Sequence, residues 1–82
     1  MLNNPHIKIN HPMADAISVQ DSPYHMCRPG RSSEIAFFKD GTFVCEPLPE
    51  FAEYHDGSYF DTAVYGYVPN EMIETFLVEC RA

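Results

Sequence analysis

Two hydrophobic runs flank an Asp-Gly pair near the middle of the chain. Residues 34–39 (EIAFFK) and 42–45 (TFVC) are rich in aromatic and β-branched side chains, which favour extended strands. Between them, Asp40 and Gly41 are suited to the positive φ angles of a two-residue type I′ turn. The pattern therefore predicts a β-hairpin over residues 34–45.

The turn also fixes which residues of the hairpin face one another. It predicts four facing pairs, Phe38 with Phe43, Phe37 with Val44, Ala36 with Cys45, and Ile35 with Glu46. Both faces of such a hairpin are hydrophobic. In so short a chain, we expect either that both faces are covered or that one is left for a partner.

Near the end of the chain, the hydrophobic residues recur with the period of a helix instead of the alternation of a strand. Five hydrophobic residues recur at the spacing of a helix and fall on one of its faces, namely Met72, Ile73, Phe76, Leu77 and Cys80. Glu71 and Glu74 lie in the first turns and Arg81 at the end, where each complements the helix dipole. Pro69 suits the first helical position. The sequence therefore predicts an amphipathic C-terminal helix.

Shorter patterns complete the predicted domain. Residues 7–9 alternate as an edge strand does, inside an otherwise poorly ordered start over residues 1–12. Residues 15–20 and 58–68 predict two further strands. Eighty-two residues allow one domain. We therefore expect a single α+β domain, residues 1–82, with a small antiparallel sheet, a β-hairpin and a C-terminal amphipathic helix.

Charge is distributed unevenly along the chain. The net charge is −7, and nine of the twelve carboxylates lie in residues 40–82 beside a single basic residue, Arg81, an excess of eight negative charges. Residues 1–39 carry three carboxylates and four basic residues. An acidic segment that is also rich in aromatics suits a basic groove on another protein. The same charge disfavours direct binding to nucleic acid or to an anionic membrane.

Candidate chemistry is sparse. The cysteines, at 27, 45 and 80, are an odd number without close spacing or a hydrophobic leader, so we expect a cytoplasmic protein without a disulfide framework. Structural zinc needs two close ligand pairs, and His25 with Cys27 supplies at best one. We therefore expect no metal and no cofactor. A thiolate at Cys27, stabilised by nearby arginines, is a further alternative.

Motifs of the common enzyme classes are missing from the sequence. Nucleotide-binding, metalloprotease and serine-hydrolase motifs do not occur, and the carboxylates do not follow the pattern of a calcium-binding loop. Hydrophobic runs also fall short of the roughly 20 residues that a membrane-spanning helix needs. We expect neither an enzyme nor a membrane protein.

The acidic segment remains as the candidate site. Its carboxylates can simply form a solvated face that keeps a small domain soluble. The sharper hypothesis is that they imitate the phosphates of DNA, compete for the same lysines and arginines, and gain from the same release of counterions. The residues expected to bind the partner are Glu46, Glu50, Glu53, Asp56, Asp61, Glu71 and Glu74.

One stretch resembles a known group of proteins. Residues 60–69 (FDTAVYGYVP), followed by a helix with Glu71 and Glu74, look like the strand, tyrosine-glycine, valine-proline and helix arrangement of some small phage anti-CRISPR proteins. The resemblance covers residues 60–79. Members of this group are small, acidic and in many cases non-enzymatic, and they bind CRISPR effector complexes, often at the DNA-binding surface. The resemblance implies a phage protein that acts in the host-cell cytoplasm.

These patterns predict a small acidic inhibitor, a monomer or homodimer, that binds a basic nucleic-acid-binding surface of a protein complex and blocks nucleic-acid binding. The resemblance implies that a CRISPR effector is such a complex. The alternative is a non-enzymatic adaptor or structural protein that binds or dimerises through the hydrophobic 34–45 hairpin. Salt distinguishes the two, because binding through charges weakens as salt rises and hydrophobic docking is less sensitive.

Overall fold

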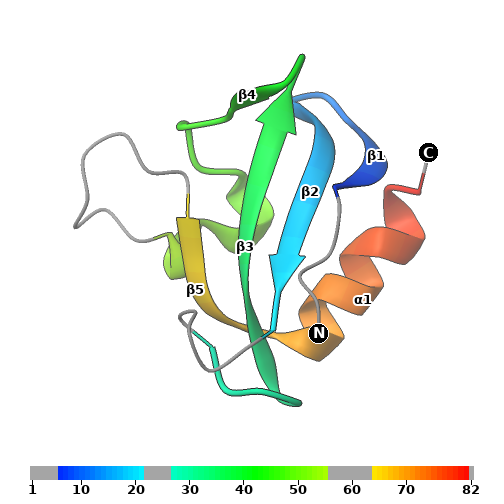
Figure 1. Ribbon diagram of the computed structural model, residues 1–82. Coiled ribbons are helices and arrows are strands. Elements are labelled where there is room, and N and C mark those ends of the chain that lie inside the picture. The colour runs from blue at the N-terminus through cyan, green and yellow to red at the C-terminus, as the bar shows by residue number, and fades with distance from the viewer. Residues whose placement is uncertain (1–5, 22–26, 56–63, 82) are drawn as a thin grey trace.

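The computed structural model describes residues 6–21, 27–55 and 64–81. Within them, a twisted antiparallel sheet carries a 3₁₀ helix and an α-helix on one face (Figure 1). The elements are β1 (Ile7–His11), β2 (Ala14–Gln20), β3 (Ser32–Lys39), β4 (Thr42–Phe43), η1 (Pro49–Tyr54), β5 (Val64–Pro69) and α1 (Asn70–Glu79). The expected α+β class, with its hairpin and C-terminal helix, is confirmed.

Strand β3 is the centre of the sheet. The strand order is β1-β2-β3-β4, and β5 also pairs with β3, on the edge that β2 leaves open. The register places Ile17 beside Phe37 and Val19 beside Ile35, so these four side chains point to the same face. Ile17, Ile35 and Phe37 are buried, and the two helices cover them. The expected edge strand near the N-terminus is present as β1.

The turn of the hairpin forms as the sequence predicts. Asp40 and Gly41 have φ angles of 52° and 79°, which are those of a type I′ turn. Phe38 pairs with Phe43, and their ring centroids are 4.6 Å apart. The backbone N–H of Val44 still donates to the carbonyl of Phe37, at 2.9 Å.

Beyond this point the predicted hairpin is too long. Strand β4 ends at Phe43. Ala36 and Ile35 of β3, which were expected to face Cys45 and Glu46, instead pair with Val64 and Tyr65 of β5. The early end follows from this competition, because β5 occupies the edge of β3 that a longer β4 would need. Pro47 and Pro49, which cannot donate to a strand ladder, lie just beyond this point. Between them, Leu48 is fully buried, so the chain leaves the sheet edge to place this side chain in the core.

Strand β5 contains a bulge that shapes the core. Ser33 pairs with Val68 and Ile35 with Tyr65, so β5 has one residue more than β3 in this interval. Tyr67 takes up the extra length with a φ of 55°. The bulge lets Tyr65 and Val68, three positions apart, both be fully buried. Of the predicted 58–68 strand, residues 58–63 lie outside the described residues.

Helix α1 follows β5 directly. Pro69 still pairs with Ser32 in the sheet, and the helix begins at Asn70, one residue later than the sequence indicated. The predicted hydrophobic face is confirmed, since Ile73 and Phe76 are buried and Met72, Leu77 and Cys80 pack partly buried against the core. At the other end of the helix, the Asn10 N–H donates to the Cys80 carbonyl at 2.7 Å, which joins the helix end to β1.

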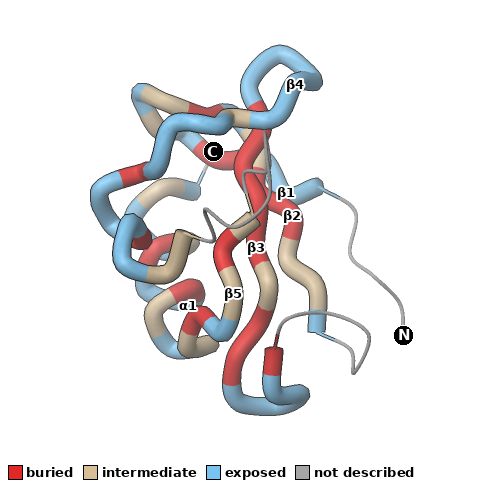
Figure 2. Tube along the Cα trace, turned by 90° about the vertical axis from the view of Figure 1, so that its left-hand side faces the viewer, coloured by how far each residue is buried: buried red, intermediate tan, exposed pale blue. Residues whose placement is uncertain are grey.

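Helix η1 was not predicted from the sequence. It runs across the same face of the sheet as α1 (Figure 2) and inserts Phe51 into the core. The Phe51 ring lies 5.9 Å from Phe37, 6.4 Å from Tyr65 and 5.1 Å from Phe76, measured between ring centroids. Such tilted and edge-to-face aromatic contacts add to the stabilisation from burial. The aromatic core thus holds η1 and α1 beside each other.

Candidate binding groove between η1 and α1

A groove of about 380 Å³ lies where η1 and α1 meet, hereafter the η1–α1 groove. Its apolar lining comes from Phe51 of η1 and from Met72 and Phe76 of α1. Both phenylalanines belong to the core and are almost fully buried, whereas Met72 is only partly covered. The two rings of the floor are therefore held by the core packing beneath them.

Carboxylates surround this apolar floor. Glu50 approaches from η1, and Glu71 and Glu79 approach from α1 on either side of Thr75. Residues four apart on a helix share a face, and eight positions correspond to about 12 Å along the axis. The described residues that line the groove include no lysine or arginine. The groove therefore combines a hydrophobic floor with an acidic rim.

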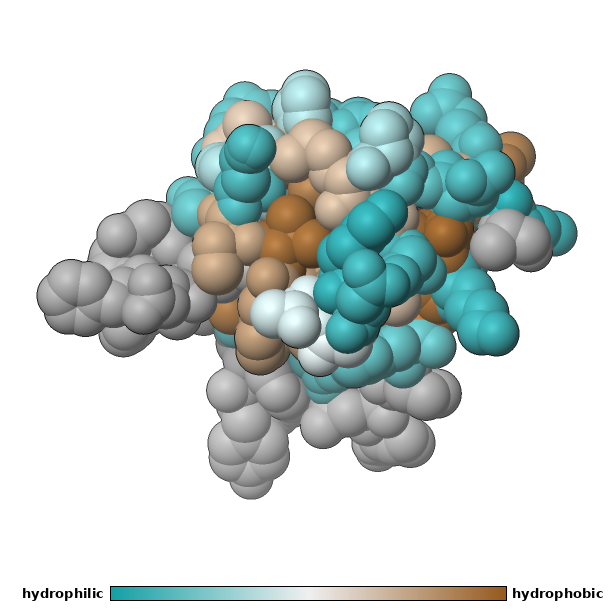
Figure 3. Space-filling model, turned by 90° about the horizontal axis from the view of Figure 1, so that it is seen from above, coloured by the Kyte–Doolittle hydropathy of each residue, from teal (hydrophilic) through white to brown (hydrophobic). Residues whose placement is uncertain are grey.

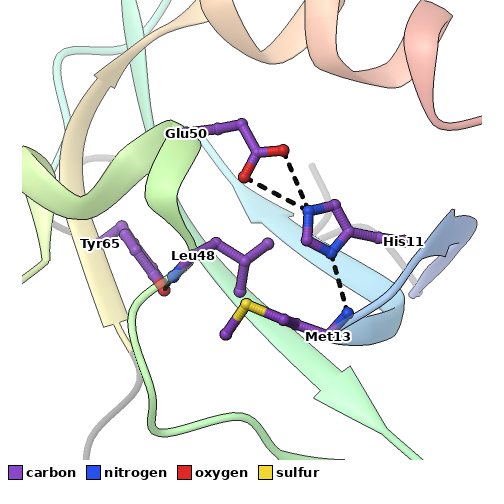
Figure 4. Close-up of polar contacts among 5 residues, drawn as sticks. All are labelled: His11, Met13, Leu48, Glu50 and Tyr65. Atoms are coloured by element: carbon purple, nitrogen blue, oxygen red, sulfur yellow. Dashed lines mark hydrogen bonds and ion pairs between the residues drawn. The ribbon is translucent and has the colours of Figure 1, made fainter.

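Two contacts fix η1 in place. The backbone N–H of Leu48 donates to the Tyr65 hydroxyl at 3.0 Å, in a buried position. This bond satisfies a backbone donor just before the helix begins, at a site where an unpaired N–H would be costly. It also ties the start of η1 to β5 (Figure 4).

The second contact joins η1 to the edge strand. The His11 side chain is 7% exposed, and its Nε2 lies 3.0 Å and 3.3 Å from the two carboxylate oxygens of Glu50 (Figure 4). Its Nδ1 accepts a bond from the Met13 backbone N–H at 3.0 Å. This pattern assigns the tautomer with the proton on Nε2. No ring nitrogen is left to act as a general base, so His11 orients Glu50 instead.

Local electrostatics keep two nearby groups protonated. Burial raises the pKa of the Tyr65 hydroxyl, and the charge of Glu50 adds to the rise while the bond from Leu48 opposes it. Burial likewise raises the pKa of the Cys80 thiol, helped by the charges of Glu50 and Glu79. A raised pKa is the opposite of what a reactive thiolate needs. The groove side of the molecule therefore offers carboxylates and no nucleophilic thiolate at Cys80.

The predicted site residues fall into four groups. Glu50 and Glu71 meet at the η1–α1 groove, whereas Glu74 lies on another side of α1, beside a smaller depression lined by Asp21 and Ser33. Glu46 and Glu53 are exposed but do not line the groove. Asp56 and Asp61 lie outside the described residues.

Glu79 was not among the predicted site residues, although it lines the groove. The signal that identifies it is its spacing from Glu71, because residues at positions 71, 75 and 79 share one helix face. The spacing alone does not show where the helix ends or that η1 lies beside it. The residue becomes part of a site only because η1 lies beside this face.

The alternative chemistry finds little support in the geometry. No disulfide links the three cysteines, all of which lie within the described residues. Cys27 is buried, whereas reactive cysteines are generally accessible. Among the residues that the structure describes, no three His, Cys, Asp or Glu side chains gather as metal ligands do. His25, the proposed partner of Cys27, lies outside them.

Part of the surface is hydrophobic. Seen from above, a hydrophobic area lies near the centre of the molecule with hydrophilic residues around it (Figure 3). Four large hydrophobic side chains are exposed within the described ranges, namely Ile7, Phe43, Tyr67 and Val78. In the same ranges, no helix is long and apolar enough to cross a membrane.

No protein-family model, curated protein or solved structure matches this chain.

Proposed function

We propose that this chain is a small, non-enzymatic inhibitor that binds a basic nucleic-acid-binding surface of a protein complex, such as a CRISPR effector, and so blocks nucleic-acid binding. The observation that carries the proposal is the meeting of Glu50, Glu71 and Glu79 around a groove that no basic residue of the described ranges lines. The net charge of −7 reinforces it. Such a surface acts like the phosphates of DNA, because it attracts the same lysines and arginines.

Further support comes from exposure and from the resemblance to phage anti-CRISPR proteins. Five of the predicted carboxylates are exposed, namely Glu46, Glu50, Glu53, Glu71 and Glu74. Exposed charges steer a partner during association, which suits an inhibitor that must compete with nucleic acid. In this proposal the protein acts in the cytoplasm of the host cell, as a monomer or homodimer.

The hairpin remains the second candidate surface, in a narrower form. Phe37 belongs to the core, so one face of the hairpin is covered by η1 and α1. On the other face, Phe43 is 51% exposed and lies against Phe38. An adaptor or homodimer contact would therefore centre on Phe43, and Phe43→Ser removes that contact without opening the core.

The test compares charge neutralisation at the groove with equal neutralisation elsewhere. The groove variant is Glu71→Gln with Glu79→Gln. The control is Asp15→Asn with Asp40→Asn, which also removes two charges. The amide introduced at position 15 keeps an oxygen acceptor for the backbone N–H of residue 40, which Asp15 binds at 3.0 Å. Asparagine also tolerates the positive φ of residue 40.

The measurements are target-DNA binding by purified CRISPR effector complexes in the presence of each variant, and direct binding to the effector at rising salt. We expect the groove variant to associate more slowly and to lose about one unit of salt slope for each contact removed. The control should behave like the unaltered chain. Unchanged affinity and slope in the groove variant, with loss of binding in Phe43→Ser, would refute the acidic surface and favour the hairpin.

A further inference from the structure

The η1–α1 groove has an apolar floor in addition to its acidic rim. About 380 Å³ of space lies over Phe51, Met72 and Phe76, which is within the lower part of the range of ligand sites, about 300–1,000 Å³. This space suits one bulky side chain of a partner. Long-range attraction between charges requires only an exposed acidic surface, so the hydrophobic floor calls for a separate explanation.

Charge complementarity determines which occupant fits. A neutral hydrophobic ligand would cover Glu71 and Glu79 without giving them a partner, and burying an unpaired charge is costly. An anionic lipid surface, or a second copy of a chain with a net charge of −7, would be repelled. Lysine and arginine, in contrast, lay apolar stems on a hydrophobic surface while the charged ends pair with carboxylates.

We infer that the groove receives one large apolar side chain of a protein partner, flanked by lysines or arginines that pair with Glu71 and Glu79. The inference rests on the proposed function and adds the anchor residue to it. His11 contributes by holding Glu50 at the η1 side of the groove through its Nε2–H. The partner segment is therefore basic and carries an apolar anchor, where simple mimicry of DNA would require only basic residues.

Two synthetic peptides of defined sequence test the inference. One has a single leucine between two pairs of lysines, and the other has alanine in place of the leucine. Each is titrated into ¹⁵N-labelled protein at low salt and followed by amide chemical shifts. The leucine peptide should shift the amides of Phe51, Met72 and Phe76 and bind about tenfold more tightly, since burying the extra side-chain carbons favours binding.

A pair of tryptophan variants locates the anchor. Thr75 is exposed and lines the groove, so Thr75→Trp fills it without removing a carboxylate. Val78 is 71% exposed on the same helix and does not line the groove, so Val78→Trp adds the same bulk elsewhere. We expect Thr75→Trp to abolish the preference for leucine and Val78→Trp to preserve it.

The outcomes separate the anchor from the proposed function. Equal binding of both peptides, weakened equally by Glu71→Gln with Glu79→Gln, would overturn the anchor and support acidic docking. A leucine preference that survives Thr75→Trp would place the anchor outside the groove and also overturn the inference. Failure of both peptides to shift any amide would overturn the inference together with the proposed function.

Discussion

The hydrogen bonds between His11 and Glu50 tie β1 to η1, and a double-mutant cycle measures how much they contribute to stability. The cycle consists of His11→Phe, Glu50→Ala and the two combined. Phenylalanine keeps an aromatic ring near Phe76, whose centroid lies 5.9 Å from that of His11. His11→Phe also removes the Nδ1 acceptor of the Met13 N–H. This loss occurs both in His11→Phe and in the double variant, so it cancels in the cycle.

The expected coupling follows from the burial of the two partners. A hydrogen bond to a charged group contributes about 1.5–3 kcal/mol when it is well buried. The His11 side chain is 7% exposed, but that of Glu50 is 43% exposed, so solvent screens one end of the contact. We therefore expect a coupling of about 1 kcal/mol, which corresponds to a change in Tm of about 4–8 °C in a domain of this size.

Urea unfolding followed by circular dichroism at neutral pH and low salt gives the four free energies of unfolding. Glu53 supplies the control, because it is exposed in the same helix. Replacing it by alanine, with and without His11→Phe, should give a coupling below about 0.3 kcal/mol. If the coupling of His11 with Glu50 is no larger than this control value, the pair does not hold η1 in place.

Three further outcomes test the packing. Phe76→Ala should lower the free energy of unfolding in urea by about 3–5 kcal/mol, because the ring is buried against Phe37 and Phe51; a loss below about 0.5 kcal/mol would contradict this packing. Burial raises the pKa of Tyr65 above its ordinary value. The contribution of Tyr65 to the free energy of unfolding should therefore be complete below about pH 10. It should be lost as pH rises through the folded-state pKa, by at most about 1.4 kcal/mol per pH unit. Tyr65→Phe should show a shallower alkaline loss in the same assay, and equal slopes would count against the burial. Tyr67→Asn should raise the Tm, with a gain of about 0.5–1 kcal/mol, because asparagine tolerates the φ of 55° better than tyrosine; a lower Tm would show that the exposed ring stabilises the bulge.

The parts of the fold that were predicted from the sequence are those whose signal is local. Asp40 and Gly41 determine their own turn, so the pairing of Phe38 with Phe43 follows from two adjacent residues. The hydrophobic face of α1 is likewise a property of one continuous segment. In both cases the preference of the backbone and the burial of side chains favour the same structure, and such agreement makes a prediction reliable.

The errors arose where distant segments compete. Cys45 and Glu46 can extend the hairpin, but β5 occupies that edge of β3, and a local pattern does not reveal this competitor. Helix η1 was missed for a related reason. Its single buried residue, Phe51, gives no periodicity, and its position depends on the Tyr65 hydroxyl, which bonds a residue 17 positions earlier.

Predicting the candidate site requires both the excess of acidic residues and the position of each one in the fold. The excess of acidic residues is visible in the sequence, but it does not distinguish Glu71, which lines the groove, from Glu74, which does not. The distinction requires knowing which side of α1 faces η1. It also explains why Glu79 was overlooked, since only the position of η1 makes the helix face with residues 71, 75 and 79 part of a site.

Within the described residues, the charged side chains that line this groove are all acidic. Like charges that face one groove repel each other, and a domain under selection for stability alone would intersperse both signs. Among the described residues that line the groove, no lysine or arginine offsets that repulsion, and the imidazole of His11 bonds to Glu50 at the η1 side. The aromatic core beneath the groove, with Phe51 and Phe76 in contact, holds together η1 and α1, from which these carboxylates extend. Under the proposed function, the cationic side chains of a basic partner would pair with this acidic rim and so offset the repulsion between its carboxylates.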